Sequence, residues 1–425
     1  MASAVGHLLE LAVPEKYDVK RGKWTFAHLP LIPPEFELKP ITKTASRLKL
    51  LAKLIKRKDI TGLINACDAG REGELIFRYI VQATHAKQPI QRLWLQSMTP
   101  GSIREAFAHL RSDEEMQPLA QAAKSRSEAD WLVGINGTRA LTAFNNKNGG
   151  FFLTTVGRVQ TPTLALVVER ERERMAFVPE DYWQIRGMGA AQGAAEDDRF
   201  KIAHKTARFT DKDAAETAYG HVDGAKTATV AAVTKRSRKQ QPPTPFATTS
   251  LQAAAAAEGI SPARTMRIAE SLYMAGLISY PRVDNTVYPA TLDLGAVVSD
   301  LAKINPALAP VCKKVLAGPM KPTRGKVETT DHPPIYPTGE GDPSTLDGGQ
   351  RKLYDLIARR FLATLMGPAT IENTKLELDV NGEPFVASGD VLVTPGFREA
   401  YPYGLKRSEE RRVGKECRSR WSPYH

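Results

Sequence analysis

The segment from Thr61 to Thr84 (TGLINACDAGREGELIFRYIVQAT) constrains the fold of this chain most strongly. Its apolar run at 63–67 is typical of a buried strand, and the apolar residues that follow position 74 recur at helical spacing. A turn that contains two glycines joins these two stretches. Strand, turn and helix in this order predict an α/β unit, in which ligands gather at the carboxyl end of the strand.

The turn itself holds three carboxylates, Asp68, Glu72 and Glu74, within seven residues. Carboxylates at this density repel one another, and a divalent cation relieves the repulsion. Mg²⁺ favours one or two carboxylates together with water and phosphate oxygens, so the turn is a candidate Mg²⁺ site. The alternative is a solvated turn whose acidic residues stabilise the start of the helix.

A second segment, LISYPRVDN (277–285), brings a tyrosine and an arginine together. Pro281 fixes the backbone after Tyr280 and ends any preceding helix, and Arg282 follows at once. A tyrosine oxygen can attack phosphorus while a guanidinium holds the phosphate oxygens in its planar fork. The segment therefore suits transfer of a phosphodiester to protein, although Tyr-Pro is more often the end of a buried strand.

Three weaker patterns accompany these two. The turn at 155–160 (TVGRVQ) offers backbone, Arg and Gln donors to a phosphate, or it is an ordinary loop. Arg126 and Arg139 lie on the predicted helix before it (124–145), where arginines are commonly just solvated. His332, in DHPPI, is the only histidine near the tyrosine segment in sequence, and a lone histidine is more often structural than catalytic.

Composition narrows the class of protein. The net charge of +12 favours a polyanionic partner, although four of these charges come from seven basic and three acidic residues at 406–420. The three cysteines form no C-x-x-C pair, which argues against a zinc site or a disulfide framework and favours a cytoplasmic setting. No apolar run approaches the ~20 residues of a membrane span.

Taken together, five segments resemble the motifs of type IA DNA topoisomerases, and those of bacterial topoisomerase III in particular. ACDAGREGELI (66–76) resembles the acidic Toprim motif. ADWLVGINGTRA (129–140) and TTVGRVQTPTLALVVERE (154–171) resemble two successive gate-strand motifs. SLYMAGLISYPRVDN (271–285) resembles the active-site tyrosine motif, and TTDHPPIYPT (329–338) resembles the histidine motif. The order is that of the family.

The resemblance implies a multidomain α/β plus α+β fold. In the family, a Rossmann-like Toprim domain and a strand-binding domain form the base of a torus, and a β-rich arch carries the tyrosine domain. The boundaries expected here are a partial Toprim domain at 1–118 that lacks its first strand, the base domain at 119–176, the arch at 177–242 and 362–405, the tyrosine domain at 243–361, and a non-native tail at 406–425.

The resemblance also implies roles for individual residues. Tyr280 is the expected nucleophile, which forms a 5′-phosphotyrosine link, with Arg282 and His332 assisting. Asp68 is the expected Mg²⁺ ligand together with Glu72, which is also a candidate catalytic acid. The residues expected to contact single-stranded DNA are Trp24, Arg126, Arg139, Thr155, Val156, Gly157, Arg158, Val159, Gln160 and Arg282.

The implied function is ATP-independent cleavage and religation of one DNA strand, which relaxes negative supercoils and decatenates DNA. Mg²⁺ is the expected cofactor, without ATP or zinc. The expected partners are single-stranded DNA and negatively supercoiled or catenated duplex DNA, with a helicase as a further candidate and no membrane. The protein is expected to be a cytoplasmic, nucleoid-associated monomer.

The sequence departs from the family pattern at three points. It begins after the strand whose Glu-Lys pair supplies an essential acid, it has Gly70 where many relatives carry a second Asp, and it ends before a later gate-strand motif. We therefore expect poor turnover from this polypeptide. Two other readings stay open, namely a single-stranded DNA-binding module without cleavage, and a Toprim nuclease or primase relative that shares only the acidic turn.

Overall fold

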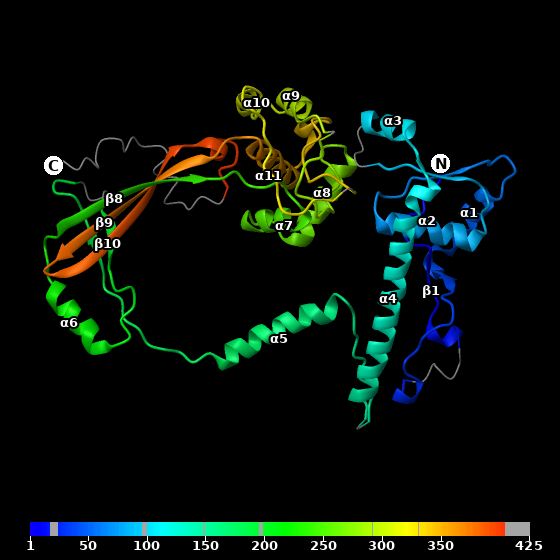
Figure 1. Cartoon of the computed structure of the whole chain (residues 1–425), viewed down its shortest axis with the longest axis horizontal. Coiled ribbons are helices and arrows are strands. Elements are labelled where there is room, and N and C mark those ends of the chain that lie inside the picture. The colour runs from blue at the N-terminus through cyan, green and yellow to red at the C-terminus, as the bar shows by residue number, and fades with distance from the viewer. Residues whose placement is uncertain are drawn as a thin grey trace. The chain divides into compact units, whose positions relative to one another are not determined.

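The computed structural model describes residues 1–17, 24–95, 100–147, 149–194, 199–290, 292–329 and 331–403. The chain divides into two compact units, Met1–Phe177 and Val178–His425, and each is described by itself. Both units combine helices with sheets (Figure 1), as the sequence predicts. The predicted tail at 406–425 lies outside the described residues.

The first unit has small sheets and one long helix. Strands β3 and β4 are parallel, β4 and β5 are antiparallel, and β1 pairs with β2. The described elements are β1 (Leu9–Leu11), β2 (Leu38–Pro40), α1 (Ala45–Ile55), β3 (Leu63–Asn65), α2 (Arg71–Thr84), β4 (Ile90–Arg92), α3 (Pro100–Ala108), β5 (Arg111–Ser112), α4 (Asp113–Asn145) and α5 (Gln160–Ala176).

The predicted strand, turn and helix are present as β3 and α2. Helix α2 buries Leu75, Tyr79 and Ile80 on one face, in a core shared with Leu51 of α1 and Ala123 of α4, among other residues. The expectation that the strand is buried is wrong in one respect. In the described residues β3 is an edge strand, so its alternation leaves the side chain of Ile64 46% exposed.

Helix α4, the longest helix in Figure 1, begins before the predicted start at residue 124. Ser112 and Glu115 form a capping box, in which the Glu115 amide donates to the Ser112 hydroxyl at 3.3 Å and the Ser112 amide donates to the Glu115 carboxylate at 2.7 Å. These bonds satisfy amides that the first turn of a helix leaves without a partner. The helix then continues across residues 118 and 119, where the sequence analysis places the boundary between the partial Toprim domain and the base domain.

The second unit contains a five-stranded antiparallel sheet in the order β6-β7-β10-β9-β8. Asn381 and Gly382, a pair that favours a two-residue hairpin turn, join β9 to β10 with φ values of 52° and 90°. The elements are β6 (Arg186–Gly189), β7 (Phe200–His204), α6 (Lys212–Val222), β8 (Thr229–Gln240), β9 (Ala369–Val380) and β10 (Glu383–Thr394).

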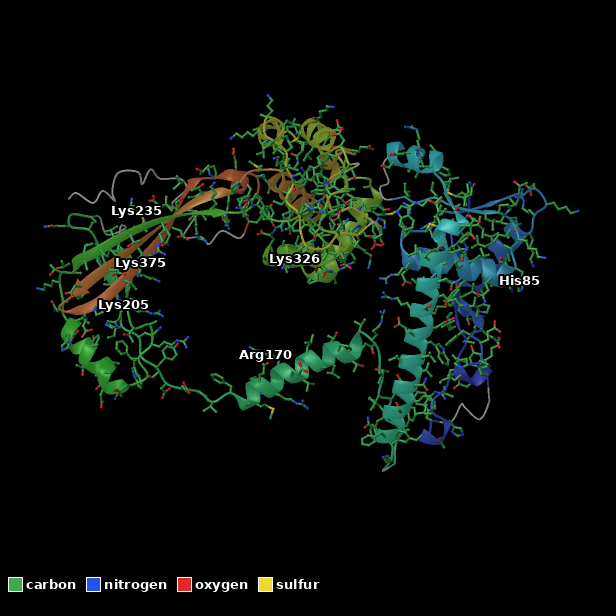
Figure 2. The ribbon with its side chains drawn as sticks, in the orientation of Figure 1. His85, Arg170, Lys205, Lys235, Lys326 and Lys375 are labelled. Carbon is green, nitrogen blue, oxygen red and sulfur yellow. The ribbon has the colours of Figure 1, made fainter. Side chains whose placement is uncertain are left out.

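Charged side chains protect the edge strand β8 of this sheet. Figure 2 labels Lys235 on β8 and Lys375 on the neighbouring β9, and Lys235 lies 3.5 Å from Glu372 of β9. Arg238 donates to Asp390 at 2.8 Å. Lysine and arginine on an exposed edge discourage pairing with another chain.

The rest of the second unit is mainly helical and contains the tyrosine segment. Ser261 and Pro262 begin α8 as the sequence predicts. The most deeply buried helix is α11, whose Leu353, Ile357 and Phe361 are inaccessible to solvent. The elements are α7 (Thr248–Ala257), α8 (Pro262–Met274), α9 (Leu294–Ile304), α10 (Ala309–Leu316) and α11 (Gly348–Thr364). No helix in the described part of the chain is long and apolar enough to cross a membrane.

Glu383, just after the hairpin turn, holds two histidines. Its carboxylate oxygens lie 2.8 Å from Nδ1 of His221 on α6 and 3.0 Å from Nε2 of His204 on β7. The amide of Thr206 donates to His204 Nδ1 at 3.0 Å, so Nε2 is the atom that carries a proton toward Glu383. Hydrogen bonds from His221 and His204 hold the pKa of the Glu383 carboxyl below its usual range.

We expect Gly73→Ala to lower the free energy of unfolding of the first unit by about 1–3 kcal/mol. A Cβ at Gly73 would lie 2.9 Å from the Asp68 amide nitrogen and would overlap the Asp68 carbonyl oxygen. Urea denaturation followed by tryptophan fluorescence measures the effect. The control is Gly101→Ala on α3, where a Cβ meets no atom within 4 Å. Equal losses in both variants would contradict the steric explanation.

We expect the Glu383 contacts to stabilise the hairpin at neutral pH and to weaken in acid. Because the folded pKa lies below the unfolded value of about 4.3, the stabilisation is present above that value and is lost as the pH falls through the folded pKa. Glu383→Gln should therefore increase amide hydrogen exchange in α6 and the hairpin turn at pH 7. This difference should shrink as the pH falls below about 4.3, after correction for intrinsic rates. Glu372→Gln is the control on the same sheet, and a difference that persisted in acid would count against the explanation.

Candidate active site

The acidic turn keeps two of its three carboxylates at the surface. Asp68 and Glu72 are exposed, and Glu72 lies 3.4 Å from Nε2 of His7. Glu74 is 1% exposed, and its carboxylate accepts from Asn65 at 3.0 Å and from Arg78 at 2.8 Å. Glu74 is therefore a structural residue, whereas Asp68 and Glu72 remain available to a ligand.

Arg92, which the sequence analysis missed, supports this turn from inside the protein. Its guanidinium donates to the main-chain carbonyls of Asn65 at 2.9 Å, Cys67 at 2.6 Å and Asp68 at 2.6 Å, and its Nε lies 3.5 Å from Glu74. Burial lowers the pKa of Arg92, but an arginine stays protonated in proteins. The available signal was a charged residue within the short segment IQRLWL (90–95), whose other residues are mostly apolar.

The turn suits a Mg²⁺ ion better than a metal that needs many protein ligands. In the described ranges, no three His, Cys, Asp or Glu side chains form a group that could hold a metal ion. Two surface carboxylates are nevertheless a donor set that Mg²⁺ accepts, because it completes its coordination with water and phosphate oxygens. The residues present therefore fit the predicted ion.

The two predicted gate-strand segments pack against each other in the first unit. The amide of Val156 donates to the Thr138 hydroxyl at 2.9 Å, and the amide of Thr154 donates to the Thr142 hydroxyl at 3.0 Å. Gly137 leaves the space that the Val156 side chain occupies, since a Cβ there would lie 2.8 Å from Val156 Cγ1. Glycine and threonine on α4 thus fix the backbone before residue 158.

The predicted DNA contacts in this region differ in burial. Thr155, Val159 and Gln160 are exposed, Val156, Gly157, Arg126 and Trp24 are half-buried, and Arg158 is exposed and donates to Asp130 at 2.7 Å. Arg139 is 4% exposed, donates to Glu15 at 2.6 Å and lies 5.3 Å from the centre of the Trp24 ring. It is not the solvated arginine considered from the sequence, because Glu15 and Trp24 lie against it.

In the tyrosine segment, buried residues alternate with residues that are exposed or half-buried. The odd-numbered residues from 279 to 285 are buried, whereas Arg282 and Asp284 are exposed and Tyr280 is half-buried. In extended backbone, residues two apart point to the same face. Tyr280 and Arg282 therefore share the outward face, as a joint contact with one phosphate requires.

Thr248, at the start of α7, anchors the backbone on both sides of Arg282. Its hydroxyl lies 2.8 Å from the Pro281 carbonyl oxygen, and it accepts from the Val283 amide at 2.8 Å. The Thr248 amide donates in turn to the Val283 carbonyl at 2.8 Å. These bonds satisfy buried polar backbone and restrict the segment to one conformation.

Ser279 and Asn285 join the tyrosine segment to the histidine segment. The Ser279 hydroxyl donates to the Pro334 carbonyl and accepts from the Tyr336 amide, both at 3.0 Å. The Asn285 amide group donates to the carbonyls of Thr329 and His332, both at 2.9 Å. Two segments that are about fifty residues apart in sequence are thus fixed side by side.

This junction brings Tyr280 and His332 together. Their ring centroids lie 4.4 Å apart at an interplanar angle of 34°, and Tyr273 of α8 lies 5.3 Å from Tyr280. His332 is 4% exposed. Beside it, burial alone would raise the pKa of Asp331, but hydrogen bonds from the Thr329 hydroxyl and the His332 amide outweigh burial and lower it. An anionic Asp331 therefore accompanies His332.

Arg282 has only a weak partner in this structure. Its Nη2 lies 3.5 Å from Glu270 of α8, and both side chains are more than half exposed. Such surface pairs contribute about 0–1 kcal/mol, so a phosphate can replace Glu270 at small cost. Burial raises the pKa of the neighbouring Tyr336 to about 12, and its phenol is structural.

Comparisons with known proteins identify the same family as the sequence motifs do. Residues 114–419 match the family model described as DNA topoisomerase. DNA topoisomerase 3 of Bacillus subtilis (strain 168) is 36% identical over 416 residues, which cover 96% of this chain and 56% of that protein. The Bacillus licheniformis protein of the same name is 34% identical over 418 residues, with the same coverage. The chain thus spans about half the length of these curated relatives.

A solved structure shows the fold. Full-length topoisomerase I from Thermotoga maritima superposes with a TM-score of 0.67 at 23% identity, and the match covers 96% of this chain and 64% of that one. The multidomain α/β fold class is confirmed, and so is the resemblance to topoisomerase III. On the family match and the shared fold together, this chain belongs to the DNA topoisomerase family.

Proposed function

We propose that this chain cleaves and rejoins one DNA strand without ATP, and that this reaction serves to relax negative supercoils and to decatenate DNA. The observation that carries the proposal is the placement of Tyr280. It lies on the outward face beside Arg282 and in ring contact with His332, on a segment anchored by buried hydrogen bonds.

In the proposed reaction the Tyr280 oxygen forms a bond to phosphorus, and the bond from phosphorus to the 3′ oxygen of the strand breaks. The product is a 5′-phosphotyrosine link and a free 3′ hydroxyl, and the reverse reaction rejoins the strand. The number of phosphodiester bonds is conserved, so no ATP is needed. Because a free phenol has a pKa near 10, Tyr280 needs help to lose its proton.

Three groups supply that help in our proposal. His332, in contact with the Tyr280 ring, assists proton transfer, and the anionic Asp331 favours a positive charge nearby. Arg282 neutralises the phosphate oxygens as charge develops on them. Asp68 and Glu72, in the first unit, would hold Mg²⁺, whose positive charge would favour binding of a phosphate, and Glu72 is also a candidate catalytic acid.

Single-stranded DNA is proposed to lie along the anchored segment at 155–160 of the first unit. The supporting features are the outward donors Arg158 and Gln160 and the nearby Trp24, Arg126 and Arg139. An aromatic ring with arginines suits base stacking and backbone neutralisation. Family membership alone supports the remaining parts of the proposal. These are action as a monomer, a reaction without ATP or zinc, a helicase partner, supercoiled and catenated substrates, and a nucleoid location.

Replacement of Tyr280 by Phe should abolish covalent trapping on a 3′-labelled single-stranded oligonucleotide in the presence of Mg²⁺. The label should follow the unaltered protein through denaturing electrophoresis and should be absent with Tyr280→Phe. The control is Tyr219→Phe, which changes an exposed tyrosine of α6 and should leave trapping intact. If neither the unaltered chain nor the control traps DNA while both bind it, the chain is a strand-binding module without cleavage.

Thr248→Val should slow formation of the covalent complex by about tenfold, which corresponds to about 1.4 kcal/mol in the barrier. The valine keeps the shape of the side chain but removes the hydroxyl that holds Pro281 and Val283. Thr248→Ser keeps the hydroxyl and should stay near the rate of the unaltered chain. Single-turnover trapping measures the rate, and equilibrium binding of the oligonucleotide should not change. Equal rates for the two variants would show that the anchor does not position Tyr280.

A further inference from the structure

A group of exposed aromatic rings lies at the carboxyl-terminal end of α4. The aromatic platform, as we name it, consists of Phe26, Phe144 and Phe151 together with Lys147. The three phenylalanine side chains are 50%, 55% and 65% exposed, respectively. Large apolar side chains gathered at one surface mark an interaction site more often than a structural feature.

Cations alternate with the rings of this platform. Lys147 Nζ lies 4.5 Å from the centre of the Phe144 ring and 5.6 Å from that of Phe26. The rings of Phe151 and Trp24 pack edge to face, with centroids 5.6 Å apart. The Arg139 guanidinium carbon lies 5.3 Å from the centroid of the Trp24 ring. The contacts thus form two sets, Lys147 with Phe26 and Phe144, and Trp24 with Phe151 and Arg139, and the short stretch from Trp24 to Phe26 joins them along the chain.

Hydrogen bonds fix the two segments that carry the rings. The Leu31 amide donates to Asn136 Oδ1 at 2.6 Å, and Asn136 Nδ2 returns a bond to the Leu31 carbonyl at 3.0 Å, which ties the segment after Phe26 to α4. On the other side, the Phe152 amide donates to Asn146 Oδ1 at 2.7 Å. The platform is thus built on anchored backbone rather than on loose chain.

The chemistry of the platform favours nucleic acid over protein. Protein interfaces are depleted in lysine relative to the rest of the surface, whereas the centre of this platform is a lysine. Sites for single strands combine aromatic rings, on which bases stack, with cations that follow the phosphates. Every base offers a ring face, so such a site tolerates any sequence.

We propose that the aromatic platform stacks bases of single-stranded DNA on Phe26, Phe144 and Phe151, while Lys147 neutralises a phosphate. The inference rests on the proposed function, because it assumes that the chain binds DNA. It extends that function from the segment at 155–160 and Trp24 to residues that have no role in the cleavage chemistry.

The test compares Phe151→Ala and Phe144→Ala with the unaltered full chain in fluorescence anisotropy titrations. The probes are a labelled oligothymidylate and an abasic strand of the same length. Each variant should bind the oligothymidylate about tenfold more weakly, within the range of about 1–3 kcal/mol per stacked base. Affinity for the abasic strand should stay unchanged, because that strand has phosphates but no bases to stack.

Two controls separate stacking from general damage. Phe107→Ala removes an exposed ring from α3, elsewhere on the same unit, and should change neither affinity. Phe151→Leu keeps an apolar side chain without an aromatic face and should lose affinity as Phe151→Ala does. Lys147→Gln should weaken both strands alike and reduce the slope of log affinity against log salt by about 1.

The results distinguish this inference from the proposed function. Unchanged oligothymidylate binding in Phe151→Ala and Phe144→Ala, with covalent trapping by Tyr280 intact, would overturn the platform alone. A failure of the unaltered chain to bind either strand would overturn both. Loss of self-association in these variants by sedimentation, with DNA affinity unchanged, would mean that the platform contacts a second copy of the chain, and would also overturn the proposal.

Discussion

Hydrogen bonds from buried side chains to main-chain atoms hold each reactive segment of this protein in place. Arg92 binds the carbonyls at the end of β3, Ser279 and Asn285 join the tyrosine segment to the histidine segment, and Thr138 supports the segment at 154–158. A buried polar group left without a partner costs about 1–3 kcal/mol. Each loop therefore has one favoured conformation, although none of them lies within a helix or a long strand.

With the exception of the buried Arg139, the charges that we assign to DNA or metal are paired differently from charges that support the fold. Arg282 with Glu270, Arg158 with Asp130 and Glu72 with His7 are exposed pairs, which contribute little and exchange partners easily. Glu74 and Arg92 are buried, and removal of Glu74 would take away the carboxylate that faces the Arg92 guanidinium at 3.5 Å. The protein thus keeps weakly paired charges where a phosphate or an ion can replace the partner.

Much of the local structure was predictable from the sequence, and the reasons are chemical. Asn381-Gly382 favours a two-residue hairpin, and Ser261-Pro262 favours a helix start. The start of α4 was missed, although Ser112 and Glu115 carry the capping pattern. The exposure of Ile64 was missed because the position of a strand in its sheet depends on its neighbours.

The sequence by itself determined the family and the order of the motifs, and it predicted the chemistry of Tyr280, Arg282 and the acidic turn, because these depend on residue types within short segments. Only the tertiary structure decided that Glu74 and Arg139 are buried, that Arg92 and Thr248 anchor the reactive loops, and that Tyr280 meets His332. Arg139 pairs with Glu15 from 124 residues away, and Arg92 with Asn65 from 27 residues away. Such partners depend on how the whole chain packs, which no local pattern records.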